Sequence, residues 1–157
     1  MPDDATLIGQ GNMAFLGGNF DEARRHYISA VLADERDGHA KLLYAYANFA
    51  SGDYTVAGLA LQRALLTTAT LMDYPVDPRP LYDDDTRLAA QIAELTAHVS
   101  ARPSDRSSAF MLAYMQYAVG HPAGALAILA SLVETDSADT LAALLQDAVI
   151  RAGIGAP

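Results

Sequence analysis

One short pattern recurs along the chain at a constant step. Gly18-Asn19-Phe20 is followed 34 residues later by Gly52-Asp53-Tyr54, and Gly120-His121-Pro122 lies two such steps further on. Apolar positions keep the same step, with Ala23, Ala57 and Ala125 in one register and Tyr27, Leu61, Leu95 and Leu129 in another. A fixed period of this length indicates a helical-repeat array, so each unit is predicted to be two helices joined by a tight turn.

The residues around each recurring glycine suit such a helix–turn–helix unit. Glycine can take the left-handed conformation that ends a helix, and Asn19 or Asp21 is placed to cap the helix that follows. Small residues recur where the paired helices would face each other, namely Gly11, Ala45 and Ala113 opposite Ala23, Ala57 and Ala125. Small side chains there let two antiparallel helices approach closely. The apolar content is dominated by Ala and Leu, which also favours an all-α chain.

Three of the units share a common set of residues. The first has Gly11-Asn12, Phe15, Gly18, Phe20, Asp21-Glu22-Ala23, Tyr27, Ala30 and Asp34; the second has Ala45, Gly52-Asp53-Tyr54, Ala57, Leu61 and Ala64-Leu65; the last has Ala113, Tyr117, Gly120, Ala125 and Leu129. Over most of residues 7–133 this set resembles the tetratricopeptide repeat (TPR) family, as a bacterial-type member with one remodelled repeat.

The resemblance implies an all-α, TPR-like α-solenoid of about eight helices in a single domain over residues 1–157. Its repeats would span approximately residues 4–37, 38–71, 72–105 (degenerate) and 106–139. A capping helix over 137–152 would cover the last repeat, as repeat arrays require.

The third unit departs from the pattern in its first half. Its second half keeps Leu88, Leu95 and Val99 in register, but residues 73–85 hold three prolines within six residues. Proline interrupts a helix because it lacks an N–H group and its ring clashes with the preceding turn. An extended, partly polyproline-like segment is therefore predicted in place of a helix, with the length of the repeat preserved.

In the TPR family the first helices of the repeats line a concave groove. The family's groove positions fall on Asn12, Phe15, Leu16, His39, Leu42, Tyr46, Phe49, Phe110, Tyr114 and Tyr117. The resemblance implies a protein–protein interaction scaffold or adaptor that binds a partner peptide or protein in this partly aromatic groove. Members that clamp a terminal carboxylate use Lys, Arg and Asn on this face; only Asn12 remains here, so an apolar ligand segment is expected.

Two arrangements of the groove stay open at this point. Either it is free for a partner, or residues 73–85 lie in it, since proline-rich segments dock on aromatic-lined grooves. Other functions also stay open: a structural or oligomer-forming module of a larger assembly, a secretion-type chaperone, or a small-molecule sensor.

The residues that would carry chemistry are dispersed. The four histidines show no metal-ligand spacing, the chain has no cysteine, and no phosphate-binding glycine loop or nucleophile elbow occurs, so an enzyme, a cofactor and a metal site are not expected. Asp83-Asp84-Asp85 lacks the glycine and the closing glutamate of a calcium loop. Asp84 or Asp85 is instead predicted to cap a helix beginning near Thr86.

Charge and hydropathy limit the partners further. With a net charge of −9 and scattered Lys and Arg residues, nucleic acid is not an expected partner. The uncharged stretch 107–133 is broken by Gln116 and Gly120-His121-Pro122, so it is interpreted as two short helices and not as a membrane span. Because no basic region and apolar run follow Met1, a cytoplasmic location is expected if the chain is full-length, and none is assigned if it is excised.

The small-residue seams generate a stability prediction. Ala57→Leu places three additional carbon atoms between two helices that are predicted to be in close contact, so it should lower the free energy of unfolding by roughly 1–3 kcal/mol. Chemical denaturation of the variant measures this loss. An unchanged unfolding free energy would contradict the register assigned to the repeats.

Overall fold

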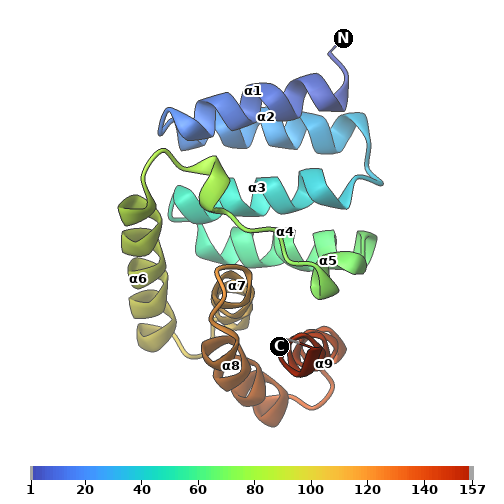
Figure 1. The fold of residues 1–157 in the computed structure, drawn as a ribbon, viewed down its shortest axis with the longest axis vertical. Helices are drawn as coiled ribbons and strands as arrows, with labels where there is room; N and C mark the ends of the chain where they lie inside the picture. Colours follow the sequence, from blue (N-terminus) through green and yellow to red (C-terminus); the bar gives the residue numbers. More distant parts are fainter. Residues whose placement is uncertain (1, 156–157) are drawn as a thin grey trace.

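The computed structural model of the protein describes residues 2–155, and this part of the chain is helical without any strand. Its long helices are α1 (Asp4–Leu16), α2 (Phe20–Ala33), α3 (Gly38–Ala50), α4 (Tyr54–Thr67), α6 (Asp85–Ala101), α7 (Arg106–Ala118), α8 (Pro122–Thr135) and α9 (Thr140–Gly155) (Figure 1). A short helix α5 (Thr70–Asp73) and a 3₁₀ turn η1 (Arg79–Leu81) lie between α4 and α6. The predicted all-α class with about eight helices is confirmed. None of the helices within residues 2–155 has the length and apolar character needed to cross a bilayer.

The recurring glycines end three helices in the same way. Gly18, Gly52 and Gly120 have φ angles of +78°, +86° and +91°, whereas the other residue types within 2–155 all have negative φ. After each glycine, the next backbone N–H donates to the carbonyl five residues earlier, with N···O distances of 2.9 Å (Asn19 to Ala14), 2.9 Å (Asp53 to Asn48) and 2.7 Å (His121 to Gln116). This is the Schellman arrangement, in which the left-handed residue is normally glycine. The 34-residue step in the sequence is therefore a repeated helix end in the structure.

The first four helices form two antiparallel pairs packed side by side, α1 with α2 and α3 with α4 (Figure 1). The two helices of each pair approach closely at the small residues, as predicted. A Cβ atom on Gly11 would lie 2.4 Å from Cε1 of Tyr27, so only hydrogen fits there. Ala45 and Ala57 are fully buried in the same layer. Asn19 caps α2 by accepting a hydrogen bond from the N–H of Glu22 at 3.4 Å, which confirms one of the two predicted caps.

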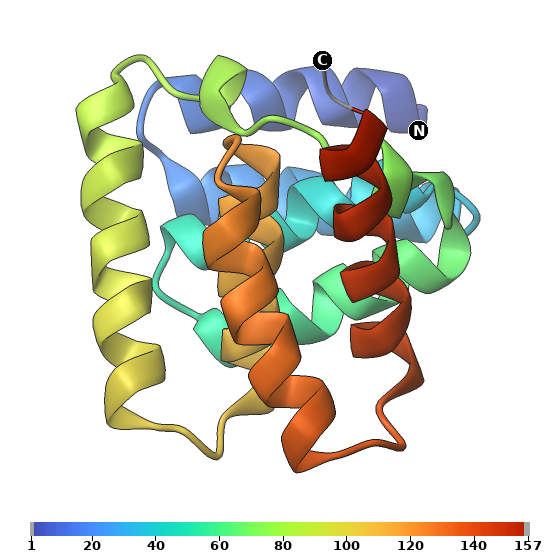
Figure 2. The same cartoon turned by 60° about the horizontal axis from the view of Figure 1, so that its bottom comes forward.

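The third antiparallel pair of helices is not formed, and this changes which helices pack against α4. In the absence of a helix over residues 74–84, α4 packs directly on α7. The approach is so close that a Cβ on Gly58 of α4 would lie 2.0 Å from the carbonyl oxygen of Ser107. Helix α6 stands at one edge of the molecule, where it packs on α7 and lies beside the C-terminal end of α3 (Figures 1 and 2). The uncharged stretch 107–133 forms α7 and α8, which confirms its interpretation as two helices.

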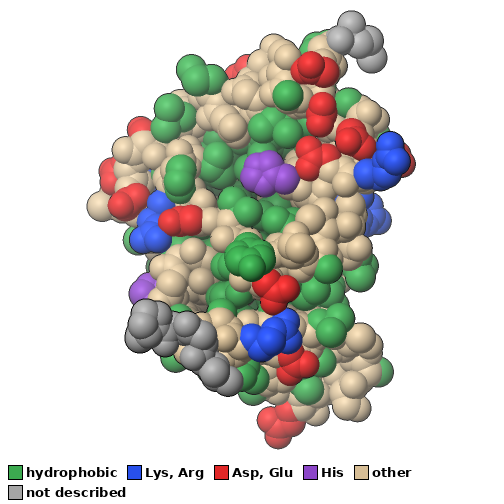
Figure 3. All heavy atoms as spheres, turned by 45° about the vertical axis from the view of Figure 1, so that its right-hand side comes forward, with side chains coloured by type: hydrophobic (Ala, Val, Ile, Leu, Met, Phe, Trp, Pro, Cys, Tyr) green, Lys and Arg blue, Asp and Glu red, His purple; other side chains and the backbone are tan. Residues whose placement is uncertain are grey.

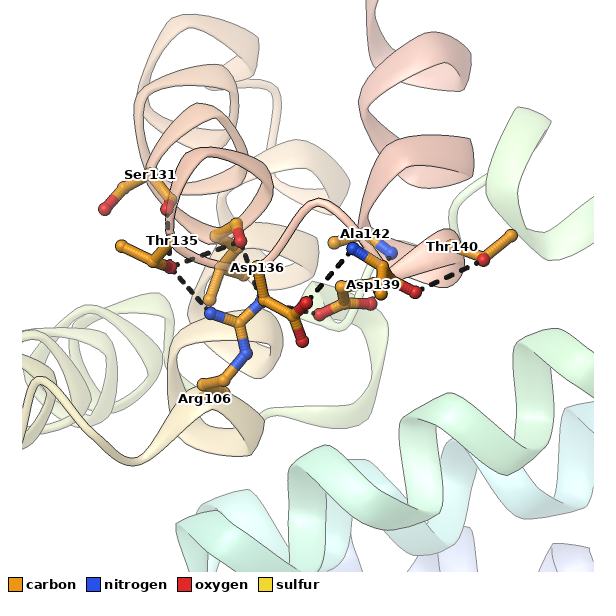
Figure 4. Close-up of polar contacts among 9 residues, drawn as sticks. Arg106, Ser131, Thr135, Asp136, Asp139, Thr140 and Ala142 are labelled. Carbon is orange, nitrogen blue, oxygen red and sulfur yellow. Dashed lines mark hydrogen bonds and ion pairs between the residues drawn. The ribbon is translucent and has the colours of Figure 1, made fainter.

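Arg106 joins the last three helices. Its guanidinium donates to the carbonyl of Leu132 at 2.8 Å and to Oγ1 of Thr135 at 2.7 Å, both near the end of α8, and to Oδ2 of Asp139 at 2.8 Å (Figure 4). Asp139 in turn accepts from the N–H of Ala142, so it caps α9. The final helix was predicted over 137–152; α9 begins at Thr140 and continues to Gly155.

Asp105 is the corresponding junction between α4, α6 and α7. Its carboxylate accepts from the N–H and Oγ of Ser108 at 3.1 and 2.6 Å and from Oγ1 of Thr55 at 2.8 Å, and it lies 3.0 Å from Nε2 of His98. Partial burial acts to raise the pKa of Asp105, but the hydrogen bonds from His98, Ser108 and Thr55 outweigh it and hold the pKa well below its usual range. His98 thus lies at a contact between helices, with its ring 5.0 Å from that of Tyr54.

We expect Asp105→Asn to lower the free energy of unfolding at pH 7 by about 1–3 kcal/mol, because an amide cannot accept all of these bonds. A carboxyl with a depressed folded-state pKa stabilises the fold above its ordinary pKa of about 4, and this contribution is lost as the pH falls through the folded-state value. The difference in unfolding free energy between Asp105→Asn and the wild type should therefore become smaller below about pH 4. Urea denaturation at pH 7 and at pH 3 measures it, with exposed Glu134→Gln as the control; a pH-independent difference would contradict this role.

Candidate functional site: a covered tyrosine face and an open apolar groove

Most of the residues predicted to line the groove are covered. Seven of the ten are at most 7% exposed: Phe15, Leu42, Tyr46, Phe49, Phe110, Tyr114 and Tyr117. The other three lie nearer the surface. Leu16 is 42% exposed and His39 is exposed, while Asn12 is half-buried and accepts a hydrogen bond from the Tyr27 hydroxyl at 2.7 Å. Asn12 is therefore engaged in holding α1 to α2.

Helix α5 and the segment that follows it, residues 71–82, cover part of this face, and three tyrosine hydroxyls bind their backbone. Tyr46 of α3 donates to the carbonyl of Val76. Tyr114 and Tyr117 of α7 donate to the carbonyls of Leu71 at 2.9 Å and Asp73 at 3.3 Å. All three bonds go to backbone oxygens, so they do not depend on which side chains the segment carries.

Apolar contacts hold the far end of the segment. The Tyr82 ring packs edge-on against Phe15 of α1, with a centroid distance of 4.9 Å, and lies 6.3 Å from Phe20. Its hydroxyl donates to the side-chain oxygen of Gln91 in α6. Pro78 is buried, whereas Tyr74 is 76% exposed and points away from the core. Tyr82 is therefore the main side-chain anchor of the segment.

The acidic residues of this region have separate partners. Asp73 pairs with Arg151 of α9 at 2.9 Å, and Asp77 pairs with Arg79 at 2.7 Å. Asp84 accepts from the N–H of Thr86 at 2.8 Å and caps α6, which confirms the predicted cap. Within residues 2–155 no three His, Asp or Glu side chains are grouped so that they could hold a metal ion.

Burial keeps the tyrosine hydroxyls in their donor form. Tyr46 is fully buried, which raises its pKa well above 10, and the neighbouring Tyr114 and Asp77 raise it further. Burial also raises the pKa of Tyr114 well above its ordinary value. Both groups are therefore protonated, and able to donate, at neutral pH.

These contacts decide between the two arrangements that the sequence left open. The segment occupies the groove face, so self-occupation is the arrangement in this structure. The partner-binding role of the ten residues stays a prediction. Of the seven buried ones, Phe15, Tyr46, Tyr114 and Tyr117 contact residues 71–82. Sequence reasoning named the tyrosines but not their acceptors, because a backbone carbonyl has no sequence signature.

An open apolar groove lies elsewhere on the first four helices, and sequence reasoning missed it. It is a hollow of about 520 Å³ lined mainly by Ile28, Val31 and Leu32 of α2, Val56 and Leu59 of α4, and Tyr44 of α3. We call it the α2–α4 groove. The signal that could have revealed it is a second apolar stripe on α4, formed by Val56, Leu59 and Leu66 beside the buried stripe of the same helix.

The surface drawn in Figure 3 has no cluster of Lys and Arg side chains of the kind that binds nucleic acid. Hydrophobic side chains surround a histidine in the middle of this view, carboxylates gather beside it, and Lys and Arg side chains are few and lie apart. This distribution agrees with the net charge of −9.

Comparison of the chain with models of protein families, with curated proteins and with solved structures finds no match.

Replacing the buried hydroxyls tests the contacts that hold the segment. Tyr46→Phe and Tyr114→Phe each remove one donor and leave a carbonyl unpaired, so each should lower the free energy of unfolding by about 1–2 kcal/mol. Amide hydrogen exchange over residues 71–81 should become faster. Tyr74→Phe, on the exposed ring of the same segment, is the matched control and should change neither quantity. Equal exchange in all three variants would show that the hydroxyls do not hold the segment.

Proposed function

We propose that this protein is a non-catalytic interaction scaffold, a TPR-type α-solenoid whose α3 and α7 bind an extended chain. One observation supports the proposal: the hydroxyls of Tyr46, Tyr114 and Tyr117 all donate to backbone carbonyls within residues 71–76, two of them in α5 and one in the proline-containing segment after it. Because this recognition is directed at the main chain, an extended segment of another protein would satisfy the same donors.

In this proposal the protein's own residues 71–82 occupy the place of a partner segment. A tethered segment acts at an effective concentration in the millimolar range, so a partner in solution has to compete with it. The apparent affinity for the partner is then reduced by the fraction of molecules in which the face is uncovered. A partner with an aromatic residue at the place of Tyr82 would compete best, since that ring contacts Phe15 and reaches Gln91.

The experiment separates the segment from its binding face. Residues 71–82, which include Tyr82 and the acceptors of all three tyrosines, are replaced by a Gly/Ser linker of the same length, and a fluorescein-labelled peptide of residues 71–82 is added in trans. We expect the peptide to bind the linker variant with a dissociation constant on the order of 10–100 μM and to bind the wild type far more weakly, because its own segment competes. Fluorescence polarisation measures both.

Matched variants assign that binding to the proposed contacts. Tyr46→Phe in the linker variant should weaken it about fivefold to tenfold, the equivalent of one hydrogen bond of about 1–1.4 kcal/mol. A peptide with alanine for Tyr82 should bind more weakly, and one with alanine for the exposed Tyr74 should bind unchanged. If a linker variant that is helical by circular dichroism binds no peptide, the scaffold proposal fails.

A second candidate function is an oligomer-forming module, and the terminal helix favours it. Leu144 and Ile150 of α9 are 47% and 42% exposed on the helix that ends the array, where a further molecule could stack. Light scattering on the purified protein distinguishes the two functions: a monomer argues against the oligomer-forming module, and a mass that increases with concentration supports it.

A further inference from the structure

The α2–α4 groove gathers exposed apolar side chains. Nine large hydrophobic residues are exposed within residues 2–155, and four of them lie on these two helices: Leu32, Val56, Leu59 and Leu66, exposed by 70%, 43%, 49% and 73%. Single exposed leucines are common on proteins, but a cluster beside a hollow marks a binding surface. This cluster lies outside the set of residues that contact residues 71–82.

The groove also carries positive charge on an acidic protein. Lys41 of α3 and Arg63 of α4 line it, together with Glu35 of the loop between α2 and α3. Lys41 Nζ donates to Oγ1 of Thr67 at 2.8 Å, one turn beyond Arg63, so the two cations share one end of the groove. Glu35 leaves this end with a net positive charge, whereas the whole chain carries −9.

These two cations differ from most others in the chain. Six of the other eight Lys and Arg residues pair with a carboxylate, namely Arg24, Arg36, Arg79, Arg87, Arg106 and Arg151. Within residues 2–155, neither Lys41 nor Arg63 has a carboxylate within 4.0 Å. An apolar surface with uncompensated cations at one end is complementary to an apolar ligand that carries carboxylates.

The length of the stripe indicates the form of that ligand. Val56 and Leu66 are separated by ten residues along α4, which is about 15 Å or nearly three helical turns. A helix of that length can lie between two neighbouring helices and present apolar residues at i, i+3 or i+4, and i+7. We propose that the α2–α4 groove binds an amphipathic helix of a partner protein, with its apolar face on Leu32, Val56 and Leu59 and its carboxylates toward Lys41 and Arg63.

This proposal does not depend on the scaffold role of the tyrosine face. The two surfaces use different residues, so an extended chain on Tyr46 and Tyr114 and a helix on Leu59 can bind the same molecule.

A selection experiment tests the proposal that the α2–α4 groove binds a helix. A displayed library of helical peptides about 15 residues long is selected against the intact protein. We expect the enriched peptides to share apolar residues at helical spacing with Asp or Glu beside them. Leu59→Glu should weaken binding of a synthetic enriched peptide at least about tenfold in fluorescence polarisation. Tyr74→Glu, at a solvent-exposed position outside the groove, is the matched control and should leave binding unchanged.

Charge reversal provides the second arm. The double variant Lys41→Glu with Arg63→Glu should bind the acidic peptide about tenfold more weakly. It should bind more tightly a copy of the peptide in which Lys replaces each Asp and Glu. Leu59 and Arg63 are exposed and Lys41 is half-buried, and thermal melts check that both variants are folded. The proposal is overturned if no peptide is enriched, if enriched peptides bind Leu59→Glu as tightly as the wild type, or if the charge-reversed variant binds both peptides with the wild-type affinity. It is also overturned if sedimentation shows a dimer that Leu59→Glu abolishes, since a second copy then occupies the groove.

Discussion

The arrangement of this protein depends on the three prolines of residues 75–80. Pro75, Pro78 and Pro80 have no N–H to give to a helix, so the stretch that would be the first helix of the third pair is not α-helical and contains only the 3₁₀ turn η1. Two consequences follow. Helix α4, without that helix beside it, packs directly on α7, with Gly58 allowing the backbone contact. The carbonyl of Val76, outside any helix, accepts its hydrogen bond from Tyr46 of α3, while Tyr114 and Tyr117 of α7 donate to carbonyls of α5 just before this stretch.

The segment is held differently along its length, and this bears on how it could be released. Near α5 the contacts are hydrogen bonds to its backbone and a solvent-exposed ion pair between Asp73 and Arg151. At the far end the Tyr82 ring is buried between α1 and α6. Exposed ion pairs stabilise little, whereas an aromatic ring packed against others stabilises more. Opening is therefore expected to begin at residues 73–77, and it can occur without disturbing the helix pairs.

Two surfaces of opposite character thus lie on the first four helices and α7. One is aromatic, covered, and satisfied by main-chain carbonyls; the other is aliphatic, open, and carries cations that lack carboxylate partners. In the proposed functions the first binds an extended chain in competition with the protein's own segment, and the second binds a helix without competition. The tyrosine face is thereby regulated by the chain itself, while the α2–α4 groove is available in every molecule.

Local features of this fold could be predicted from residues close together in the sequence. The glycine turns at Gly18, Gly52 and Gly120, the cap at Asp84 and the absence of a helix over residues 74–84 each depend on the backbone preferences of a few neighbouring residues. The aromatic residues of the groove face were also identified in advance, since they keep the position of helices that repeat at a constant step.

Only the tertiary structure decided what those residues contact. The acceptors of Tyr46, Tyr114 and Tyr117 lie 30, 43 and 44 residues away in the chain, and they are carbonyls, which every residue carries. The contacts of Tyr82 with Phe15 and Gln91, the ion pair of Arg151 with Asp73 and the hollow between α2 and α4 likewise depend on the tertiary structure. Sequence spacing determines which face of a helix a side chain occupies, but the surface it meets depends on how the helices pack once the prolines have removed one of them.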